Sequence, residues 1–366
     1  MYVSGVAMRH FRNYERAELA LAQGLNVVVG PNGAGKTNLL EAGYFGLTGR
    51  SFRTSTDREV VALGARLARV EVHVEAEDGA HALEVGLEPG QEKRIRVDGS
   101  PLAPGADPPR PLVSVFLPDR LDLVKGPPAG RRAHLDRVVT ALWPARAANR
   151  SGYSRALAQR NALIGRVRSG HAAAAQLDAW DRELARHASE LMRDRASAAE
   201  LIAPAFAARA ADLGLPEPAE LRYVPRCGAA DATAVARELA ERRPADLERG
   251  FTTHGPHRDD LSLLHAGRPL RTLGSQGQQR VALLALLFAE REVLTTRGAA
   301  PLMLLDDVMS ELDLARRERL AELVTVEGQT LITATEPDHI PGAADAAMVL
   351  SVSAGSVTPA PAAAAA

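Results

Sequence analysis

The sequence predicts an α/β fold in which one head domain is split along the chain by an inserted all-helical lobe. Residues 1–126 alternate short apolar runs, helical spacings and turns, which is typical of strands and helices in one domain. Residues 127–213 are rich in alanine, arginine and leucine and nearly free of β-branched runs, and further helices are expected to about Arg249. The strand-and-helix pattern returns after Phe251. We therefore expect a head of residues 1–126 and 251–355 and a lobe of residues 127–250.

The expected elements follow the chain in order. A weakly alternating strand at residues 2–8 precedes a short apolar strand at 25–29, and a helix begins at Lys36. Further strands are expected at residues 70–75, 82–87, 94–97, 112–117 and 302–305, and a helix at 276–295. The alanine- and proline-rich residues 356–366 are expected to be a disordered tail.

Composition limits the classes of function. The chain has 366 residues with a formal net charge of −1, so its overall charge predicts no polyanionic partner. Cys227 is the only cysteine, which excludes both an intrachain disulfide and a cysteine-based zinc site and fits a reducing cytoplasm. The first 13 residues lack a secretory pattern, and no apolar run approaches the ~20 residues that cross a bilayer. We expect a soluble cytoplasmic protein without a membrane partner.

A phosphate-binding loop follows the strand at 25–29 and precedes the helix that begins at Lys36. Its glycines allow backbone N–H groups to surround phosphates, Lys36 would reach the β- and γ-phosphates, and Thr37 would ligate Mg²⁺. The chain contains only three lysines, so a chance match is rare. None of them follows an asparagine, as guanine recognition usually requires, so ATP is favoured. The loop comprises Gly30, Pro31, Asn32, Gly33, Ala34, Gly35, Lys36 and Thr37.

Two acids follow the apolar strand at 302–305. Asp306 is placed to hold Mg²⁺, and Asp307 to orient or activate the attacking water, so Lys36 and Asp307 are the candidate catalytic residues. A strand with an acidic turn is common by itself. The phosphate-binding loop upstream makes the catalytic interpretation the stronger one.

A second set of residues, in a fixed order along the chain, supports an ABC-type ATPase. Ser275, Gly277 and Gln278 match the signature S-x-G-Q, which directs a helix N-terminus at a phosphate, although Ser275 and Gln278 also have the spacing of an ordinary capping box. Ser310 and Asp313 follow the acidic pair at the positions of a D-loop. Loop, signature, acids and D-loop occur in the order that this class uses.

With these motifs, several short segments make the sequence resemble the RecF family. The resemblance rests on residues 9–14, 38–41, 51–53, 126–136 and 253–260 together with 275–280. It implies a head like those of structural-maintenance-of-chromosomes proteins. It also implies ATP-dependent homodimerisation, binding to duplex and gapped DNA, slow ATP hydrolysis stimulated by DNA, and action with RecR, and indirectly RecO, in loading RecA at gaps.

Four features depart from the wider ABC pattern. Gly274 replaces the usual leucine, and Asp307 stands where glutamate is usual. Residues 333–336 contain no switch histidine, and no Q-loop glutamine is found near residues 116–119. These departures leave the water-positioning residues unassigned and indicate slow turnover.

A basic stretch within the expected lobe is the candidate DNA surface. Residues 131–170 contain nine arginines and a single acid, Asp136, which gives a local net charge of +8. Such a surface attracts duplex phosphates without reading sequence, whereas the plainer alternative is a solvated helix face. The candidate contacts are Arg131, Arg132, Arg155, Arg160 and Arg166.

Other interpretations stay open at this point. A transporter ATPase subunit would have to dock on a membrane partner, a nuclease-partner head would need longer coiled arms than residues 127–250 provide, and a clamp could lack ATPase activity. His257 and Arg258 could be a structural pair or part of a site, and the other nine histidines show no metal-ligand spacing.

Overall fold

The computed structural model describes residues 1–103, 106, 108–119, 121–215, 217–229, 231–325, 328–343 and 346–360. The chain forms two compact units, one of Met1–Arg120 with Leu294–Ala366 and one of Leu121–Val293. No helix in these described ranges is both long and apolar enough to cross a membrane.

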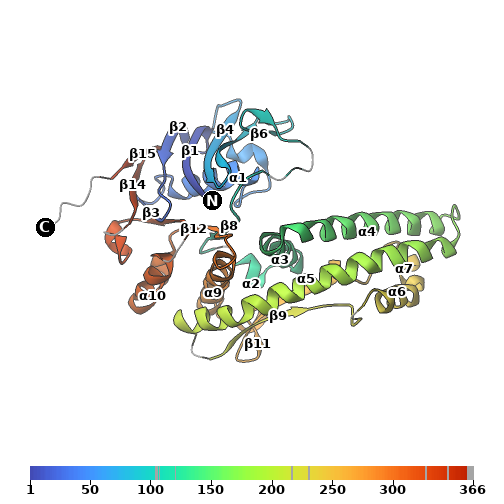
Figure 1. The fold of residues 1–366 in the computed structure, drawn as a ribbon. Coiled ribbons are helices and arrows are strands. Elements are labelled where there is room, and N and C mark those ends of the chain that lie inside the picture. Colours follow the sequence, from blue (N-terminus) through green and yellow to red (C-terminus); the bar gives the residue numbers. More distant parts are fainter. Residues whose placement is uncertain are drawn as a thin grey trace. The chain divides into compact units, whose positions relative to one another are not determined.

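The first unit contains an antiparallel sheet of order β2-β1-β4-β5-β6-β7 (Figure 1). Its long central strand shows why the sequence pairs this way: in β4 (Ala68–Ala76) the alternate residues Ala68, Val70, Val72 and Val74 are buried, so one face packs on the core. The other strands are β1 (Tyr2–Phe11), β2 (Tyr14–Ala20), β5 (Gly79–Leu87), β6 (Arg94–Val97) and β7 (Ser100–Pro101).

The second sheet of this unit has the order β15-β14-β3-β13-β12-β8 and is parallel except for β15. Its central strands are buried at every position and mostly apolar, as expected for a parallel sheet covered on both faces. The strands are β3 (Leu25–Val29), β8 (Val113–Phe116), β12 (Leu302–Leu305), β13 (Thr330–Ala334), β14 (Met348–Ser353) and β15 (Ser356–Pro359).

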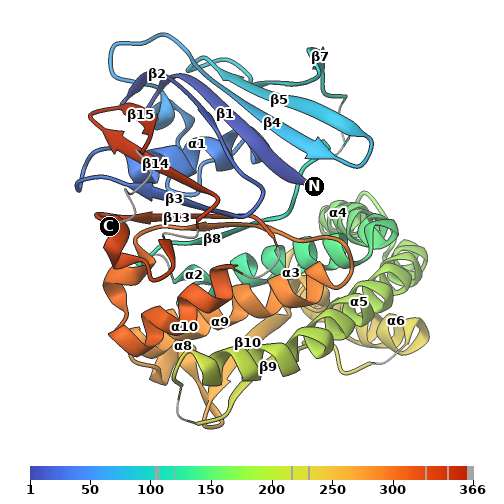
Figure 2. The same ribbon diagram turned by 60° about the vertical axis from the view of Figure 1, so that its left-hand side comes forward.

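Helix α1 (Lys36–Thr48) lies between these two sheets (Figure 2). Leu40 and Phe45 of the helix are fully buried in one core with residues of both sheets. Gly46 permits the close approach, because a Cβ atom there would lie 2.4 Å from Val72 Cγ2. The unit is completed by α10 (Leu314–Thr325) and the short helices η1 (Asp57–Val60), η5 (Val308–Glu311) and η6 (Pro337–His339).

The second unit is built on two long helices that pack along one another, α4 (Ala147–Arg168) and α5 (Leu177–Asp212). A three-stranded antiparallel sheet of order β11-β10-β9 accompanies them. The remaining elements are α2 (Asp122–Lys125), α3 (Pro128–Leu142), η2 (Pro144–Arg146), η3 (Ala174–Gln176), β9 (Ala219–Val224), α6 (Ala232–Glu241), α7 (Arg243–Arg249), η4 (Pro256–Arg258), β10 (Asp260–His265), β11 (Arg268–Pro269), α8 (Leu270–Leu273) and α9 (Gln276–Thr295).

The structure corrects three expectations. The inserted region is not all-helical, because residues 219–224 form β9, which pairs with β10 about forty residues further on, as in Leu221 with Leu263. The same pairing draws residues 251–293 into the second unit, so the expected return to the head at residue 251 comes later. Residues 356–359 are not a disordered tail but form β15, whereas residues 361–366 lie outside the described part of the chain.

Candidate nucleotide-binding site

The loop at residues 30–37 joins β3 to α1 at the carboxyl edge of the parallel sheet. Gly33 and Gly35 have φ angles of 80° and 120°, a region that side chains disfavour. A Cβ atom on Gly35 would also lie 2.6 Å from Asn13 Nδ2 and 2.9 Å from the Tyr14 hydroxyl oxygen. Space and conformation therefore both require glycine, and the loop presents the N-terminus of a 13-residue helix, which favours anions.

Lys36 supplies a positive charge at this loop. Its Nζ donates hydrogen bonds to the carbonyl oxygens of Gly30, at 2.7 Å, and Pro31, at 3.3 Å. The side chain is 7% exposed, so the ammonium lies within the loop and not in open solvent. The residues thus fit a phosphate group, because charge and N–H donors converge on one small region.

Residues of the first hairpin hold the loop from outside. Asn13 Nδ2 donates to the carbonyl of Ala34 at 3.0 Å, and the Tyr14 hydroxyl donates to the carbonyl of Gly35 at 3.0 Å. Burial raises the pKa of Tyr14 above its ordinary value, which keeps the hydroxyl protonated as a donor. The hairpin therefore preorganises the loop, a role that the sequence motifs did not reveal.

Thr37 and Asp306 meet beside the loop as expected. Thr37 Oγ1 donates to Asp306 Oδ2 at 2.7 Å, and Thr333 Oγ1 donates to Asp306 Oδ1 at 2.8 Å. Burial raises the pKa of Asp306, while the hydrogen bonds from the two threonines oppose that rise. The hydroxyl and carboxylate oxygens of Thr37 and Asp306 are the donor type that Mg²⁺ prefers.

Thr333 was missed as a site residue. Residues 333–336 contain no switch histidine, and no function was expected of Thr333 itself. The structure places it on β13, next to β12, where its hydroxyl contacts both members of the acidic pair. A hydroxyl residue at the carboxyl end of a buried parallel strand is the signal that could have found it.

Asp307 differs from its neighbour in surroundings and in backbone conformation. Its φ angle is 45°, an uncommon value outside glycine, and its N–H donates to Thr333 Oγ1 at 2.8 Å. The Asp307 carbonyl accepts a hydrogen bond from Ser310 Oγ at 2.7 Å. Its half-buried carboxylate has no hydrogen bond or ion pair to any residue that the structure describes, so it can accept a proton from water.

Several separate sequence segments converge near the loop through polar contacts. Arg12 Nη2 and Nε lie 2.6 and 2.9 Å from the two carboxylate oxygens of Glu41. Ser51 Oγ donates to the same carboxylate at 2.5 Å, and Arg53 Nη1 donates to Asn38 Oδ1 at 2.6 Å. These contacts connect α1 to Arg12, which precedes the loop in sequence, and to residues 51–53, which follow α1.

A cavity of about 410 Å³ adjoins this group and brings Thr37 and Asp306 to one surface with basic side chains. Residues 117–119, where a Q-loop glutamine was expected but is absent from the sequence, line the cavity together with Thr37 and Asp306. Its lining consists of Arg12, Thr37, Arg53, Thr54, Glu59, Leu117, Pro118, Asp119 and Asp306.

Comparisons with known proteins decide the family. The family model described as the RecF/RecN/SMC N-terminal domain matches residues 2–358. The chain is 38% identical over 362 residues to the DNA replication and repair protein RecF of Streptomyces avermitilis, covering 93% of this chain and 95% of that protein. The chain belongs to the RecF family. The RecF protein of Frankia alni is also 38% identical, over 360 residues, with the same shares of both chains covered.

Solved structures agree with the RecF-family assignment. Two structures of the recombination mediator protein RecF in the RecFOR pathway, one with ATP and one with ATPrS, have TM-scores of 0.85 and 0.82. Each is 27% identical to this chain and covers 98% of both chains. The Smc head domain of Pyrococcus furiosus has the same fold, with a TM-score of 0.62 at 18% identity over 98% of this chain and 96% of that one.

The expected signature of this RecF-family chain begins α9 in the second unit. Ser275 N donates to Gln278 Oε1 at 2.9 Å, and Gln278 N donates to Ser275 Oγ at 3.2 Å. The capping box that the spacing allowed is therefore present. Ser275 and Gly277 are exposed, so the helix N-terminus is accessible from solvent.

The residues of the expected D-loop have local roles in the first unit. The Asp313 carboxylate accepts a hydrogen bond from Arg316 N at 3.0 Å and caps α10. Ser310 and Asp313 are both exposed, which leaves their side chains accessible to another molecule.

Two of the five candidate DNA contacts are structural instead. Arg160 is fully buried and pairs with Asp181 and Asp246, each at 2.7 Å. Arg131 is 2% exposed and pairs with Asp260 at 2.7 Å. Neither can reach DNA in this structure. Their partners Asp181, Asp246 and Asp260 all lie outside residues 131–170. Counting charge along that stretch therefore overestimated the accessible positive charge.

The other candidates divide by exposure. Arg132 is half-buried and donates to the backbone carbonyl of Asp259 at 2.7 Å. Arg155 and Arg166 are exposed on α4, and Arg168 near its end is exposed as well. Within the described ranges these three arginines have no ion pair, so their charge faces solvent.

His257 has a structural environment. Its Nε2 lies 3.0 Å from the Thr252 carbonyl, which can only accept, so Nε2 carries the proton and Nδ1 accepts from the Tyr153 hydroxyl at 2.6 Å. Burial lowers the pKa of His257 to about 4. The structural alternative is thereby favoured for His257, while the Arg258 guanidinium stacks 5.6 Å from the centre of the Phe251 ring.

Proposed function

We propose that this chain is an ATP-dependent DNA-binding protein of recombinational repair, with weak, DNA-stimulated ATPase activity. One observation carries the proposal: in a RecF-family head, Lys36 lies within the glycine loop and Thr37 donates a hydrogen bond to Asp306, whose neighbour is Asp307. The RecF relatives named as DNA replication and repair proteins match nearly the full chain, which supports the repair role.

The proposed ligands of the first site are ATP and Mg²⁺. Cleavage of the phosphoanhydride bond of ATP would time the dissociation of the dimer and the release of DNA. The N–H groups of residues 30–37 and Lys36 would bind its phosphates, while Thr37 and Asp306 would hold the ion. Asp307 would accept the proton of the attacking water, because its carboxylate is not engaged elsewhere among the described residues. Aspartate, one methylene shorter than glutamate, fits slow turnover.

Dimerisation would complete the site. We infer that ATP held by Lys36 of one copy is closed over by Ser275, Gly277 and Gln278 of a second copy, with Ser310 and Asp313 at the contact between the copies. The exposure of Ser275 and Gly277 at the start of α9 supports this arrangement, because a helix N-terminus stabilises negative charge.

DNA would be bound by charge and shape. Arg155, Arg166 and Arg168 are exposed along one helix and would contact duplex phosphates without reading sequence. Arg132 would contribute only if its bond to Asp259 opened. The proposed partners are RecR, and indirectly RecO, in loading RecA at single-strand gaps, and the cytoplasm is the proposed location.

A binding series tests the proposal. The affinity of the full chain for duplex, gapped and single-stranded DNA would be measured by fluorescence anisotropy with and without ATP and Mg²⁺, beside Lys36→Ala. We expect ATP to strengthen binding to duplex or gapped DNA and Lys36→Ala to lose most ATP affinity while staying folded. Equal DNA binding with and without ATP, or wild-type ATP affinity in Lys36→Ala, would contradict it.

A further inference from the structure

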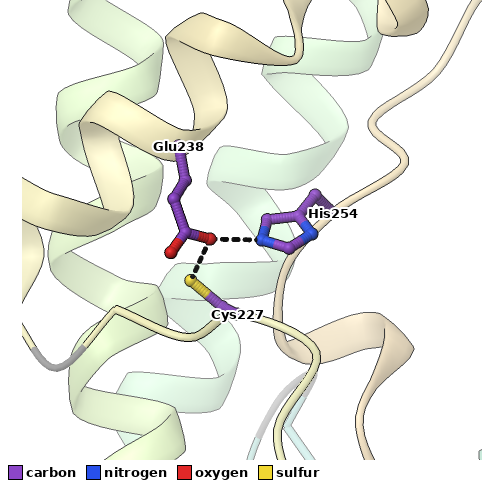
Figure 3. Close-up of side chains that lie close together, drawn as sticks. All are labelled: Cys227, Glu238 and His254. Atoms are coloured by element: carbon purple, nitrogen blue, oxygen red, sulfur yellow. Dashed lines mark hydrogen bonds and ion pairs between the residues drawn. The ribbon is translucent and has the colours of Figure 1, made fainter.

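A compact cluster of three metal-ligating side chains lies in the second unit, and none of the three side chains belongs to the candidate nucleotide-binding site. Cys227 follows β9, Glu238 is on α6, and His254 lies between α7 and η4. All three side chains point toward one another (Figure 3), and one ligand atom from each lies within 4.8 Å of the others. We propose that Cys227, Glu238 and His254 bind one divalent transition-metal ion of the Zn²⁺ class.

The distances within the cluster suit three ligands of one ion. Glu238 Oε2 lies 3.1 Å from Cys227 Sγ and 2.5 Å from His254 Nε2. Bond lengths of about 2.0 Å to nitrogen or oxygen and about 2.3 Å to sulfur place tetrahedral ligand atoms roughly 3.5 Å apart. Each of these two atom pairs would therefore need to move apart by less than about 1 Å to surround an ion.

The surroundings hold the three groups in place. Asp231 caps α6 by accepting a hydrogen bond from Ala234 N at 2.9 Å, and Val235 and Leu239 anchor the helix in a core that also contains Cys227. Cys227 is 2% exposed, whereas the Glu238 side chain is 29% exposed. Packing against the core therefore holds the ligands in place, as a preorganised site requires, while Glu238 stays partly open to solvent.

The ligand types select the metal. A thiolate, an imidazole and a carboxylate together suit Zn²⁺ or Co²⁺, whereas Mg²⁺ and Ca²⁺ prefer oxygen ligands alone. Three protein ligands leave a fourth tetrahedral position for water. A cavity of about 530 Å³ borders Cys227.

Under this proposal, the expectation that a single cysteine excludes a cysteine-based zinc site is wrong, because a carboxylate and an imidazole supply the other ligands. Three elements separated by 11 and 16 residues supply one ligand of each type, a spacing that no short metal motif contains. A bound ion would tie the segment after β9 to α6 and to the loop before η4. It would therefore stabilise the second unit independently of the nucleotide.

Cobalt titration tests the site, because Cys227 is the only possible source of a thiolate-to-cobalt band. Metal-stripped full-length protein, reduced and without nucleotide, would be titrated with Co²⁺ and followed by near-ultraviolet absorbance. We expect one Co²⁺ per chain with a charge-transfer band that Zn²⁺ displaces and Mg²⁺ does not. The band should be lost in Cys227→Ser, and Co²⁺ affinity should fall about 100-fold or more in Glu238→Gln and His254→Ala.

Glu241→Gln on the same helix and His171→Ala at an exposed position of the same unit serve as matched controls and should bind like wild type. Thermal unfolding gives a second readout, since Zn²⁺ should raise the melting temperature of the wild type and both controls but not of the three ligand variants. Absence of a thiolate band in the wild type, or equal Co²⁺ affinity in Glu238→Gln and Glu241→Gln, would overturn the proposal.

Discussion

Arg12 donates two hydrogen bonds to the carboxylate of Glu41, from Nη2 at 2.6 Å and from Nε at 2.9 Å, and the two residues lie 29 positions apart in sequence. Glu41 is fully buried on α1, one turn after the phosphate-binding loop. Arg12 also donates to the Glu59 carbonyl at 2.7 Å, so it connects α1 to η1. This pair fixes the first turns of α1 relative to the hairpin that supports the loop.

Glu41→Gln should destabilise the first unit by about 2–4 kcal/mol, because it leaves the Arg12 guanidinium largely buried without a countercharge. Urea unfolding would measure the loss. Glu59→Gln is the matched control, since Glu59 contacts Arg12 only through its backbone carbonyl and its exposed side chain has no ion pair among the described residues. Equal stabilities of the two variants would show that the pair contributes nothing beyond a neutral contact.

Asp307→Asn should slow ATP hydrolysis by about 100-fold or more, because the attacking water loses its proton acceptor. ATP binding should persist, since Lys36, Thr37 and Asp306 are unchanged. The ATP-bound dimer, and DNA held by it, should then last longer. Phosphate release and dissociation from gapped duplex would be measured for both proteins. If the variant fails to hydrolyse ATP yet releases DNA at the wild-type rate, hydrolysis does not time release.

Ser275→Arg should bind ATP but fail to dimerise, because a bulky cation would occupy the helix N-terminus that closes the partner's site. Light scattering with ATP and Mg²⁺ would report the molar mass. Ser169→Arg, an exposed change after α4, is the matched control and should dimerise normally. A normal dimer of Ser275→Arg would refute the proposed closure in trans.

Reversing the charge of the exposed arginines, as in Arg155→Glu with Arg166→Glu, should weaken binding to all DNA sequences alike. The slope of log affinity against log salt should fall by roughly one unit for each lost phosphate contact. Arg155→Lys with Arg166→Lys keeps the charge and should keep the slope. An unchanged slope in the glutamate variant would identify this helix face as merely solvated.

Arg160 gives the contrasting case, which urea unfolding would measure. Arg160→Ala removes the cation that two buried aspartates share and should lower the free energy of unfolding by about 3–5 kcal/mol.

The half-buried His257 should make stability depend on pH. Its pKa is about 4 in the folded chain and near 6.5 when unfolded, so the unfolded state binds more protons between these values. Stability from this group is therefore complete above pH 6.5 and declines as pH falls toward 4, by at most about 3 kcal/mol. Urea unfolding from pH 7 to pH 5 should show a smaller decline in His257→Gln than in wild type. Parallel declines would assign the effect to other groups.

The phosphate-binding loop, the acidic strand and the start of α9 could be predicted because each is a contiguous pattern with local causes. The strand at residues 25–29 and the helix at residues 276–295 have the expected bounds, since apolar runs and helical spacing act over a few residues. The Lys36 and Thr37 positions follow from glycines that permit one backbone path. Sequence alone thus determined the class of head and the core of its candidate site.

Contacts between distant segments decided the rest. Residues 219–224 form the strand β9 by pairing with β10, and Thr333 lies at the site because β13 is next to β12. Arg160 looked like a DNA contact until packing enclosed it with two aspartates, since burial depends on what covers a side chain and not on its neighbours in sequence. Cys227 gained two possible co-ligands in the same way: the chain fixes residue types, and long-range packing fixes which of them meet.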